Sequence, residues 1–446
     1  MSGEPPWRGR RLHFVGIGGA GMSGLALVAA ELGAQVTGSD RAESSYLAEL
    51  RAAGIEPALG HDAANVPDGA ELVYSTAIPE ENPERVAARD RGLPELHRGE
   101  LLGQVTALKR CLAVSGTHGK TTTTAMIVHA LRACGMDPAF LVGGEIRVGD
   151  GAPRNAAWGS GEWIVVEGDE SDRSLLRLDP EIAVITNAEL DHHTTYGSLR
   201  DLERTFREFL AGAAHAVVWD RPELLALRDG PVVAFDVPSP ELHADGSRFV
   251  VEGMDVRLAV PGAHNALNAA AALAACTLAG ADPRQAAAAL AEFRGVGRRF
   301  QRLGETEAGA VVYDDYAHHP TEVAATLRAA RTLAPRRLVA VFQPHLYSRT
   351  AALWREFGRA LALADLPGVV EIYPARERAS DFPGITGLLV AEAAADAAGG
   401  RRVLWLAGLD EAERVLRAEL RDGDLCLVLG AGDIDGLGRR LVAAPG

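Results

Sequence analysis

Residues 110–135 read RCLAVSGTHGKTTTTAMIVHALRACG, in which an apolar run, a glycine-rich turn and a helix-forming segment follow one another. A short apolar run before such a turn predicts a strand, and the segment after the turn predicts a helix. At a junction of this kind backbone N–H groups cradle phosphates, Lys120 reaches the β- and γ-phosphates, and the Thr121 hydroxyl can ligate magnesium. We therefore predict that GTHGKTTT (116–123) is a phosphate-binding loop.

This loop is shorter than the common form, because Val114 occupies the position of the usual first glycine and Gly116 lies only three residues before Gly119. The alternative is a turn that merely caps a helix with a basic residue. Lys120 favours phosphate binding, since only it and Lys109 are lysine among 45 basic residues. An ammonium group fits a tight phosphate loop better than the wider guanidinium of arginine.

The same pattern of strand, turn and helix occurs near the start of the chain, where RLHFVGIG (11–18) leads into GIGGAG (16–21). At this spacing the first glycine permits a tight turn, the second lets the backbone approach a diphosphate, and the third lets helix and strand pack closely. Asp40 ends the next predicted strand, where it can hold a ribose hydroxyl. The motif fits a dinucleotide or a nucleotide-sugar equally, and glycines that serve only the turn are the alternative.

Predicted strands and helices alternate to the end of the chain, which is typical of doubly wound α/β layers with mostly parallel sheets. The 446 residues are too many for one ordinary core. A fresh strand begins after residue 108, and the Gly/Arg-rich stretch GVGRR lies at 295–299. We therefore expect three domains, at 1–108, 109–300 and 301–446.

The composition is 47% hydrophobic and 24% charged, which excludes a disordered or fibrous protein. The net charge of −15 gives no sign of the basic face with which proteins bind nucleic acid. No apolar run is long enough for a membrane span, and the polar, proline-rich residues 1–7 are unlike a signal peptide, so we expect a cytoplasmic protein. Four widely separated cysteines predict buried free thiols rather than disulfides or zinc ligands.

Five polar stretches follow predicted strands or begin predicted helices. Ligands of open α/β sheets bind at the carboxyl ends of strands, and a carboxylate beside a phosphate loop is where a magnesium ligand lies. Ordinary solvated or capping turns are the alternative for each stretch. They are EGDESD (167–172), NAELDHH (187–193), AHNALNA (263–269), DDYAHHPTE (314–322) and FQPHLYSRT (342–350).

Together with STAI (75–78), GVGRRFQ, IYPARE (372–377) and GAGDI (430–434), these motifs occur in the order found in the bacterial Mur ligases. The chain resembles that family from about residue 11 to residue 436. Within it, the resemblance is greatest to the branch that adds L-alanine to UDP-N-acetylmuramate. It implies a Rossmann-like N-terminal domain for the UDP-sugar, a P-loop-type central domain for ATP and Mg²⁺, and a Rossmann-like C-terminal domain that helps to bind ATP and the amino acid.

The resemblance further implies an ATP-dependent amide ligase of peptidoglycan precursor synthesis. The lactyl carboxylate of UDP-N-acetylmuramate attacks the γ-phosphate of ATP, and the amine of L-alanine then attacks the resulting acyl phosphate. The implied partners are these small molecules, with no nucleic acid, and the sequence does not indicate an oligomeric state. The implied catalytic residues are Lys120, Glu170 and His192, and the implied magnesium ligands are Thr121, Glu170 and His192.

The resemblance also implies the binding residues. ATP contacts are expected from Gly116, Thr117, His118, Gly119, Lys120, Thr121, Thr122, Asn265, Asn268, Asp315, Tyr316 and His318. UDP-sugar contacts are expected from Gly16, Gly18, Gly19, Ala20, Gly21, Asp40, Ser75, His193 and Arg349.

Two departures from the family pattern matter. No lysine follows Lys120, so the carbamylated lysine that several Mur ligases use as a magnesium bridge is absent, as is general in the alanine-adding branch. Leu346 occupies a position that is commonly arginine and contacts substrate, so Arg349, with Arg355, is expected to carry more of that contact. The competing hypotheses are a murein tripeptide ligase, whose first loop differs from GIGGAG, an NAD-dependent oxidoreductase and a nucleotide-driven switch. The oxidoreductase leaves GTHGKTTT, DESD and DHH unexplained, and the switch leaves the first glycine loop and the third domain unexplained.

Overall fold

The computed structural model describes residues 5–147 and 152–443. Residues 1–4 of the predicted polar start lie outside the described part. The chain forms two compact units, which are treated separately below. The first unit comprises Met1–Ala188, Leu199–Asp236 and Asn268–Ala289, and the second comprises Glu189–Ser198, Val237–Leu267 and Leu290–Gly446.

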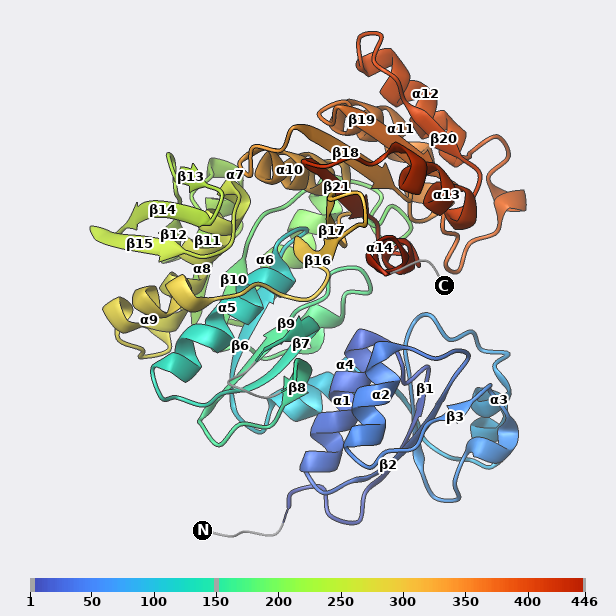
Figure 1. Cartoon of the computed structure of the whole chain (residues 1–446). Helices are drawn as coiled ribbons and strands as arrows, with labels where there is room; N and C mark the ends of the chain where they lie inside the picture. Colours follow the sequence, from blue (N-terminus) through green and yellow to red (C-terminus); the bar gives the residue numbers. More distant parts are fainter. Residues whose placement is uncertain (1–4, 148–151, 444–446) are drawn as a thin grey trace. The chain divides into compact units, whose positions relative to one another are not determined.

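The first unit begins with a five-stranded parallel sheet in the order β3-β2-β1-β4-β5. Helices α1 and α2 lie side by side against one face of this sheet, and α3 lies on its other side (Figure 1). The strands are β1 Arg11–Val15, β2 Gln35–Asp40, β3 Ala58–Leu59, β4 Glu71–Tyr74 and β5 Glu95–His97. The helices are α1 Ala20–Glu31, α2 Ser45–Ala52, η1 Ala63–Asn65, α3 Pro83–Asp90 and α4 Arg98–Thr106.

A seven-stranded sheet follows in the same unit, in the order β12-β11-β10-β6-β9-β7-β8, and only β8 is antiparallel to its neighbour. Its strands are β6 Arg110–Ser115, β7 Ala139–Ile146, β8 Arg154–Ala157, β9 Trp163–Glu167, β10 Ile182–Ile185, β11 His215–Trp219 and β12 Val233–Phe235. The accompanying helices are α5 Lys120–Ala133, η2 Ser174–Arg177, α6 Leu199–Gly212, α7 Pro222–Leu225, α8 Ala263–Leu278 and α9 Pro283–Ala289. The chain passes from the second unit back into the first within α8.

The central strands of this sheet are continuous apolar runs because both faces are covered. All four residues of β10 (IAVI) are buried, and in β6 only the first residue is exposed. Such runs are typical of parallel strands between helical layers. Helix α5 packs against β6, β7 and β9. The central strands are therefore buried between two layers.

Strand register brings the motifs together. Ser115 pairs with Ile185 across β6 and β10, and Val114 pairs with Glu167 across β6 and β9, so all three strands end at one edge of the sheet. In the five-stranded sheet Val15 pairs with Ser39 and Phe14 with Val73, which places the first glycine loop, Asp40 and Ser75 at a common edge.

The second unit contains a six-stranded sheet in the order β16-β17-β21-β18-β19-β20, in which only β16 is antiparallel to its neighbour. Leu338, Ala340 and Phe342 face one apolar cluster with α10 to α12, whereas Val339 and Val341 face another with α13 and α14. A three-stranded antiparallel sheet, which the sequence patterns did not predict, precedes it. The strands are β13 Glu241–His243, β14 Gly246–Val251, β15 Met254–Leu258, β16 Gln301–Glu305, β17 Val311–Asp315, β18 Arg337–Phe342, β19 Leu366–Val370, β20 Leu404–Leu406 and β21 Asp424–Leu429. The helices are η3 Leu290–Glu292, α10 Pro320–Arg331, α11 Tyr347–Leu361, η4 Ala379–Asp381, α12 Gly387–Ala397, α13 Leu409–Glu419 and α14 Asp435–Val442.

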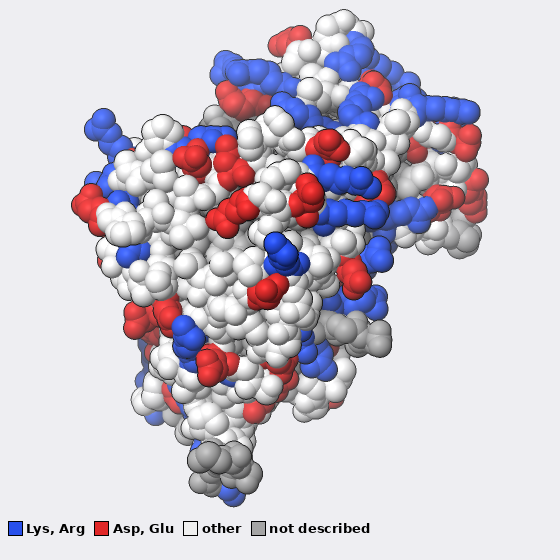
Figure 2. Space-filling view, turned by 90° about the vertical axis from the view of Figure 1, so that its left-hand side faces the viewer, with Lys and Arg blue, Asp and Glu red and all other residues white. Residues whose placement is uncertain are grey.

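The predicted α/β class with mostly parallel sheets is confirmed. All four cysteines are free, and three of them are buried, as predicted; Cys134 is partly exposed. Among the described residues no helix is long and apolar enough to cross a membrane. On the face drawn in Figure 2, acidic and basic side chains lie among uncharged ones, and the basic ones are most frequent toward the top of the view.

Candidate active site

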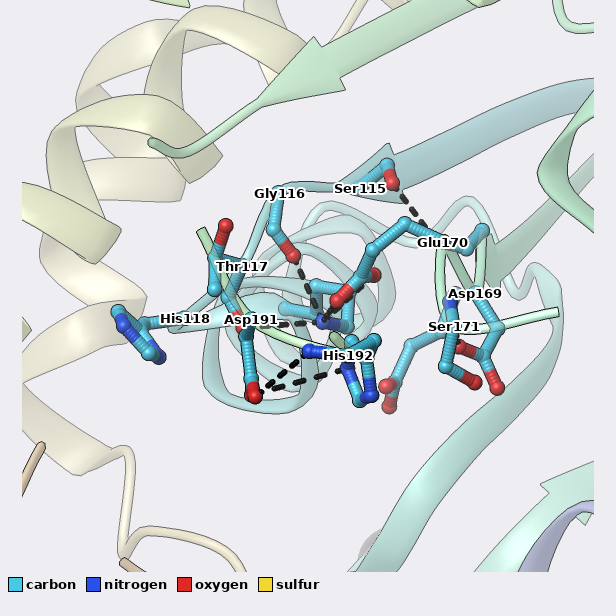
Figure 3. Close-up of polar contacts among 12 residues, drawn as sticks. Ser115, Gly116, Thr117, His118, Asp169, Glu170, Ser171, Asp191 and His192 are labelled. Atoms are coloured by element: carbon cyan, nitrogen blue, oxygen red, sulfur yellow. Dashed lines mark hydrogen bonds and ion pairs between the residues drawn. The ribbon is translucent and has the colours of Figure 1, made fainter. Parts of the chain in front are cut away.

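The predicted phosphate loop joins β6 to α5, and Lys120, the first residue of α5, folds back over it. Lys120 Nζ donates hydrogen bonds to the carbonyl oxygens of Gly116 (2.6 Å) and Thr117 (3.1 Å) and to Glu170 Oε1 (2.9 Å). Figure 3 shows the Gly116 carbonyl and the Glu170 carboxylate facing the same point. Oxygen atoms thus surround the ammonium group, in the positions that phosphate oxygens would take on binding it.

Two glycines make this tight turn possible. Gly116 has φ of +124°, and a Cβ there would collide with the Thr186 hydroxyl. Gly119 has φ of +82°, and a Cβ there would collide with the Asn268 side chain. The first collision and the left-handed backbone explain why position 116 of this short loop is glycine.

The end of β10 fixes the outer side of the loop. Asn187 Oδ1 accepts from the His118 N–H (2.9 Å), Asn187 Nδ2 donates to the His118 carbonyl (2.9 Å), and the Thr186 hydroxyl donates to that carbonyl (2.6 Å). Asn187 lies in the predicted NAELDHH stretch, but its clamping of His118 was not predicted. These three hydrogen bonds hold the loop in shape.

Carboxylates gather beside Lys120 at the end of β9. The Glu170 side chain is 1% exposed, and the Thr121 hydroxyl donates to Glu167 Oε2 (3.1 Å). Burial opposes the charge of Lys120, but the carboxylates of Glu170 and Asp169 outweigh it and raise the pKa of the ammonium group. Lys120 is therefore a cation at neutral pH. Glu167 is a residue of the EGDESD stretch to which the sequence assigned no role.

The two predicted adenine-binding amides both belong to α8 and are 7% exposed. Asn268, in the first unit, lies against Gly119 of the phosphate loop. Asn265, in the second unit, donates from Nδ2 to the Pro261 carbonyl (2.7 Å). Thr122, which follows the loop in α5, is 9% exposed.

The first glycine loop forms the predicted tight turn between β1 and α1. Gly16 has φ of +77°, and Gly19 is the N-cap of α1, so Ala20 and Gly21 begin the helix. The Gly18 N–H donates to Asp40 Oδ2 (2.8 Å). Asp40, which was predicted to hold a ribose hydroxyl, thus accepts a hydrogen bond from the loop; the ribose contact stays a prediction.

Two further residues stand at the same edge of the five-stranded sheet. Ser75 follows β4, and its hydroxyl accepts from the Ala77 N–H (3.4 Å). Arg98 begins α4 directly after β5, and its guanidinium group binds Asp169 and Asp172 of the EGDESD stretch. Arg98 was not predicted as a site residue, because its partners lie 71 and 74 residues away in sequence.

In the second unit Asp315 is the last residue of β17, and Tyr316 and His318 follow the strand. Asp315 accepts hydrogen bonds from the N–H groups of Phe300 and Ala317, and burial raises its pKa to about 6 although Arg299 opposes the shift. Burial also lowers the pKa of His318 to about 4. The Tyr316 ring packs edge-on against His318. The guanidinium groups of Arg298 and Arg299 lie over this ring, 4.9 Å and 5.0 Å from its centre.

Arg349, in α11, is 3% exposed and forms a two-pronged ion pair with Asp191 of the NAELDHH stretch. Burial would raise the pKa of Asp191, but Arg349 holds it far below the ordinary value. Arg349 Nη1 also lies 3.2 Å from Nδ1 of His345. The predicted substrate-binding guanidinium is thus already engaged by an anion.

Three neighbouring positions complete this region. His192 has a left-handed backbone (φ +53°), and its N–H donates to Asp191 (2.7 Å), a contact visible in Figure 3. Among the described residues no group hydrogen-bonds the buried Nε2 of His193. Leu346, the departure from the family pattern, has φ of +72° as the N-cap of α11 and is buried.

The structure therefore collects the predicted residues in two groups. The first unit holds the two glycine loops, Lys120, Glu170 and Asn268, whereas the second holds His192, His193, Asn265, Asp315, Tyr316, His318 and Arg349. The assembly of one site from both groups stays a prediction.

Comparison with known proteins gives consistent matches along the chain. Three family models match successive segments: "Mur ligase family, catalytic domain" at residues 11–110, "Mur ligase middle domain" at 114–276 and "Mur ligase, glutamate ligase domain" at 298–432. The UDP-N-acetylmuramate–L-alanine ligase of Rubrobacter xylanophilus is 46% identical over 97% of this chain and 99% of its own length. That of Acidithiobacillus ferrooxidans is 44% identical over 96% of both chains.

Two solved structures are similar over the whole chain. The UDP-N-acetylmuramate–alanine ligase of Thermotoga maritima has a TM-score of 0.84 and 31% identity, covering 97% of this chain and 98% of its own. A murein peptide ligase of Psychrobacter arcticus has a TM-score of 0.74 and 25% identity, with the same coverage.

Proposed function

Because the chain belongs to the Mur ligase family, we propose that it joins L-alanine to the lactyl carboxylate of UDP-N-acetylmuramate at the expense of ATP, in peptidoglycan precursor synthesis. The observation that carries the proposal is the 46% identity to a ligase of that name over nearly the whole of both chains. The predicted cytoplasmic location belongs to the same proposal.

The chemistry needs activation of a poor acylating agent. The lactyl carboxylate oxygen attacks the γ-phosphorus of ATP, the bond between the γ-phosphorus and the β–γ bridging oxygen breaks, and ADP leaves. The amine of L-alanine then attacks the acyl phosphate carbonyl, the bond to the phosphate oxygen breaks, and inorganic phosphate leaves with the amide formed. Phosphoryl transfer depends mainly on positioning and on neutralising charge.

The phosphate loop supports a role in that first step. Lys120 would exchange its contacts with the Gly116 and Thr117 carbonyls for the β- and γ-phosphates of ATP. Gly116, Thr117, His118 and Gly119 form the same turn, and the N–H groups of Thr117 and His118 donate to Asn187. We assign the adenine to Asn265 and Asn268, and we assign Asp315, Tyr316 and His318 to the nucleotide, as the family resemblance implies.

The donor set beside Lys120 fits a magnesium ion. Thr121 and Glu170 offer hydroxyl and carboxylate oxygens, the hard ligands that Mg²⁺ prefers, and Glu167 already orients the Thr121 hydroxyl. We assign Mg²⁺ binding to Thr121, Glu170 and His192. When bound there, the ion would neutralise charge on the phosphates during the transfer.

The first glycine loop is assigned to the diphosphate of the UDP-sugar rather than to NAD. Gly16, Gly18, Gly19, Ala20 and Gly21 form a turn that opens a helix, where backbone N–H groups and the helix dipole favour anions. Asp40 and Ser75 lie at the same edge of the sheet and are assigned to this substrate, with His193 and Arg349 from the second unit. The proposed domains are 1–108 for the UDP-sugar, 109–300 for ATP and Mg²⁺, and 301–446 for ATP and amino acid.

Analysis of the product tests this proposal. The protein is incubated with ATP, Mg²⁺ and UDP-N-acetylmuramate, together with either L-alanine or the murein tripeptide. The mass of the product is measured by mass spectrometry. We expect a product one alanyl residue heavier with L-alanine and none with the tripeptide. Product with the tripeptide alone would assign the chain to the murein peptide ligases.

A further inference from the structure

Arg98 is a cation to which the proposed function assigns no role. It lies at the edge of the five-stranded sheet that carries the first glycine loop, Asp40 and Ser75. It is the first residue of α4, and His97 before it pairs with Tyr74 across β4 and β5. β4 in turn pairs with β1, the strand that leads into the first glycine loop. Arg98 therefore stands at the carboxyl ends of these parallel strands, where ligands of such sheets bind.

One side of the Arg98 guanidinium is fixed by two carboxylates. Nη2 donates to Asp169 Oδ2 (2.6 Å) and to Asp172 Oδ2 (2.7 Å), and Nε donates to Asp172 Oδ2 (3.2 Å). The Asp172 side chain is 5% exposed. These two carboxylates flank Glu170 in sequence, so the Arg98 side chain has one defined orientation beside the segment that holds Glu170.

The other side of the guanidinium faces the glycine loop. A Cβ at Gly21 would lie 3.2 Å from Arg98 Nη1, so only the absence of a side chain there leaves Nη1 open toward the start of α1. No described residue accepts a hydrogen bond from Nη1. Its N–H groups are thus directed at the turn where the diphosphate is expected.

We propose that Arg98 binds the diphosphate of the UDP-sugar through Nη1, while Asp169 and Asp172 hold the guanidinium in place. This inference rests on the proposed function, which supplies the diphosphate. Guanidinium groups bind phosphate oxygens through directed, charge-assisted hydrogen bonds, and here that cation would add to the N–H groups at the start of α1. It also keeps the two carboxylates from repelling the diphosphate.

A purely structural role is the competing explanation, in which Arg98 only ties α4 to the segment 169–177. Arg177 provides the matched control, because it pairs with Glu100 of α4 and so joins the same two elements. Its charge is paired on α4 rather than at the start of α1. Loss of Arg177 removes a tie of the same kind without removing a cation from the glycine loop.

The experiment measures the affinity of the full chain, without ATP, for UDP-N-acetylmuramate, UDP and uridine, using calorimetry and, for uridine, ligand-observed NMR. For Arg98→Ala we expect the Kd of UDP-N-acetylmuramate and of UDP to rise at least about tenfold, the cost of a charge-assisted hydrogen bond. The Kd of uridine, which has no phosphate, should stay within about twofold. Arg98→Lys, which keeps a charge, should raise the Kd of UDP less than Arg98→Ala does, and Arg177→Ala should leave all three values unchanged.

The outcomes separate the two claims. If wild-type protein binds UDP-N-acetylmuramate and Arg98→Ala binds it equally well, or loses uridine and UDP affinity in equal proportion, Arg98 does not contact the diphosphate. If Arg98→Ala does not fold, Arg98→Lys decides by the same ratio of UDP to uridine affinities. If wild-type protein binds neither UDP compound, the proposed function itself is wrong.

Discussion

Lys120 is the residue on which the phosphate loop depends, because its ammonium group links two loop carbonyls to Glu170. We predict that Lys120→Ala lowers kcat to below about a tenth of the wild-type value, a rise in the barrier of more than ~1.4 kcal/mol. The Kd of UDP-N-acetylmuramate should change by less than about twofold, because that substrate is assigned to a different loop. Steady-state kinetics and calorimetry measure the two effects.

Lys109, the other lysine of the chain, is the natural control. It donates to the Gly159 carbonyl (2.9 Å) and lies over the Trp158 ring, so its role is to hold a loop. Lys109→Ala should lower the free energy of unfolding and leave kcat near the wild-type value. If Lys109→Ala and Lys120→Ala reduced kcat equally, a specific phosphate contact from Lys120 would be ruled out.

His345 makes the stability of the second unit depend on pH. Burial, with the nearby charges of His318 and Arg349, lowers the pKa of His345 from 6.5 to about 3, and Arg349 donates toward its Nδ1, which must then be unprotonated. Between pH 6.5 and 3 the unfolded chain binds a proton at this position that the folded chain does not. Stability from this group is therefore complete above pH 6.5 and is lost as the pH falls.

A substitution isolates this effect. His345→Gln cannot take up the proton. From pH 7 to pH 4.5 the free energy of unfolding of the wild type should therefore fall more than that of the variant. Urea unfolding at both pH values measures the two changes. An equal fall in both proteins would mean that His345 titrates alike in the folded and unfolded chains.

Local sequence was enough to predict the tight turn between β6 and α5 around Gly116, Gly119 and Lys120, whereas phosphate binding by this turn stays a prediction. It also predicted a carboxylate beside that loop, and the structure brings Glu170 to Lys120. Arg98 was not predictable in the same way, because nothing in its own neighbourhood indicates partners more than 70 residues away. Glu167 went unnoticed because a carboxylate that ends a strand looks the same whether or not it orients a hydroxyl.

At the level of the element, the turn between β6 and α5 tolerates only glycine at its first position. Gly116→Ala would place a methyl group in a left-handed backbone and against the Thr186 hydroxyl. Gly135, after α5, has φ of +74° but open space around it, so Gly135→Ala meets only the backbone cost. We predict that Gly116→Ala lowers the free energy of unfolding by roughly 1–3 kcal/mol more than Gly135→Ala, the usual cost of overpacking. Urea unfolding of both variants measures the difference. An equal decrease in the free energy of unfolding would show that the added methyl group does not clash with Thr186.

Elements with strong patterns were predicted closely. The apolar run and the helix-forming segment predicted within residues 110–135 are β6 Arg110–Ser115 and α5 Lys120–Ala133. The antiparallel sheet of β13, β14 and β15 was missed. β13 is exposed throughout and gives no alternation of apolar and polar residues, whereas β15 (MDVRL) alternates over only five residues. Such strands depend on pairing with neighbours rather than on a pattern of their own.

For the whole molecule, the sequence predicted three domains, and three family models match successive segments of the chain. The structure places residues 1–108 and most, but not all, of the predicted segment 109–300 in one compact unit, in which α1 packs against β7 and β8 and Asn155 donates to the Ala20 carbonyl. Changes in composition along the chain mark linkers, but they carry no information on how tightly neighbouring domains pack. The segment Glu189–Ser198, which groups with the second unit although its flanks belong to the first, was equally invisible.

The central claim is that this protein cleaves ATP only when UDP-N-acetylmuramate and L-alanine are both present. The most direct test is the release of inorganic phosphate from ATP and Mg²⁺, with UDP-N-acetylmuramate and L-alanine added singly and together. We predict sustained release only when both are present. Sustained release without the UDP-sugar would contradict the assignment of the first glycine loop and, with it, the proposed reaction.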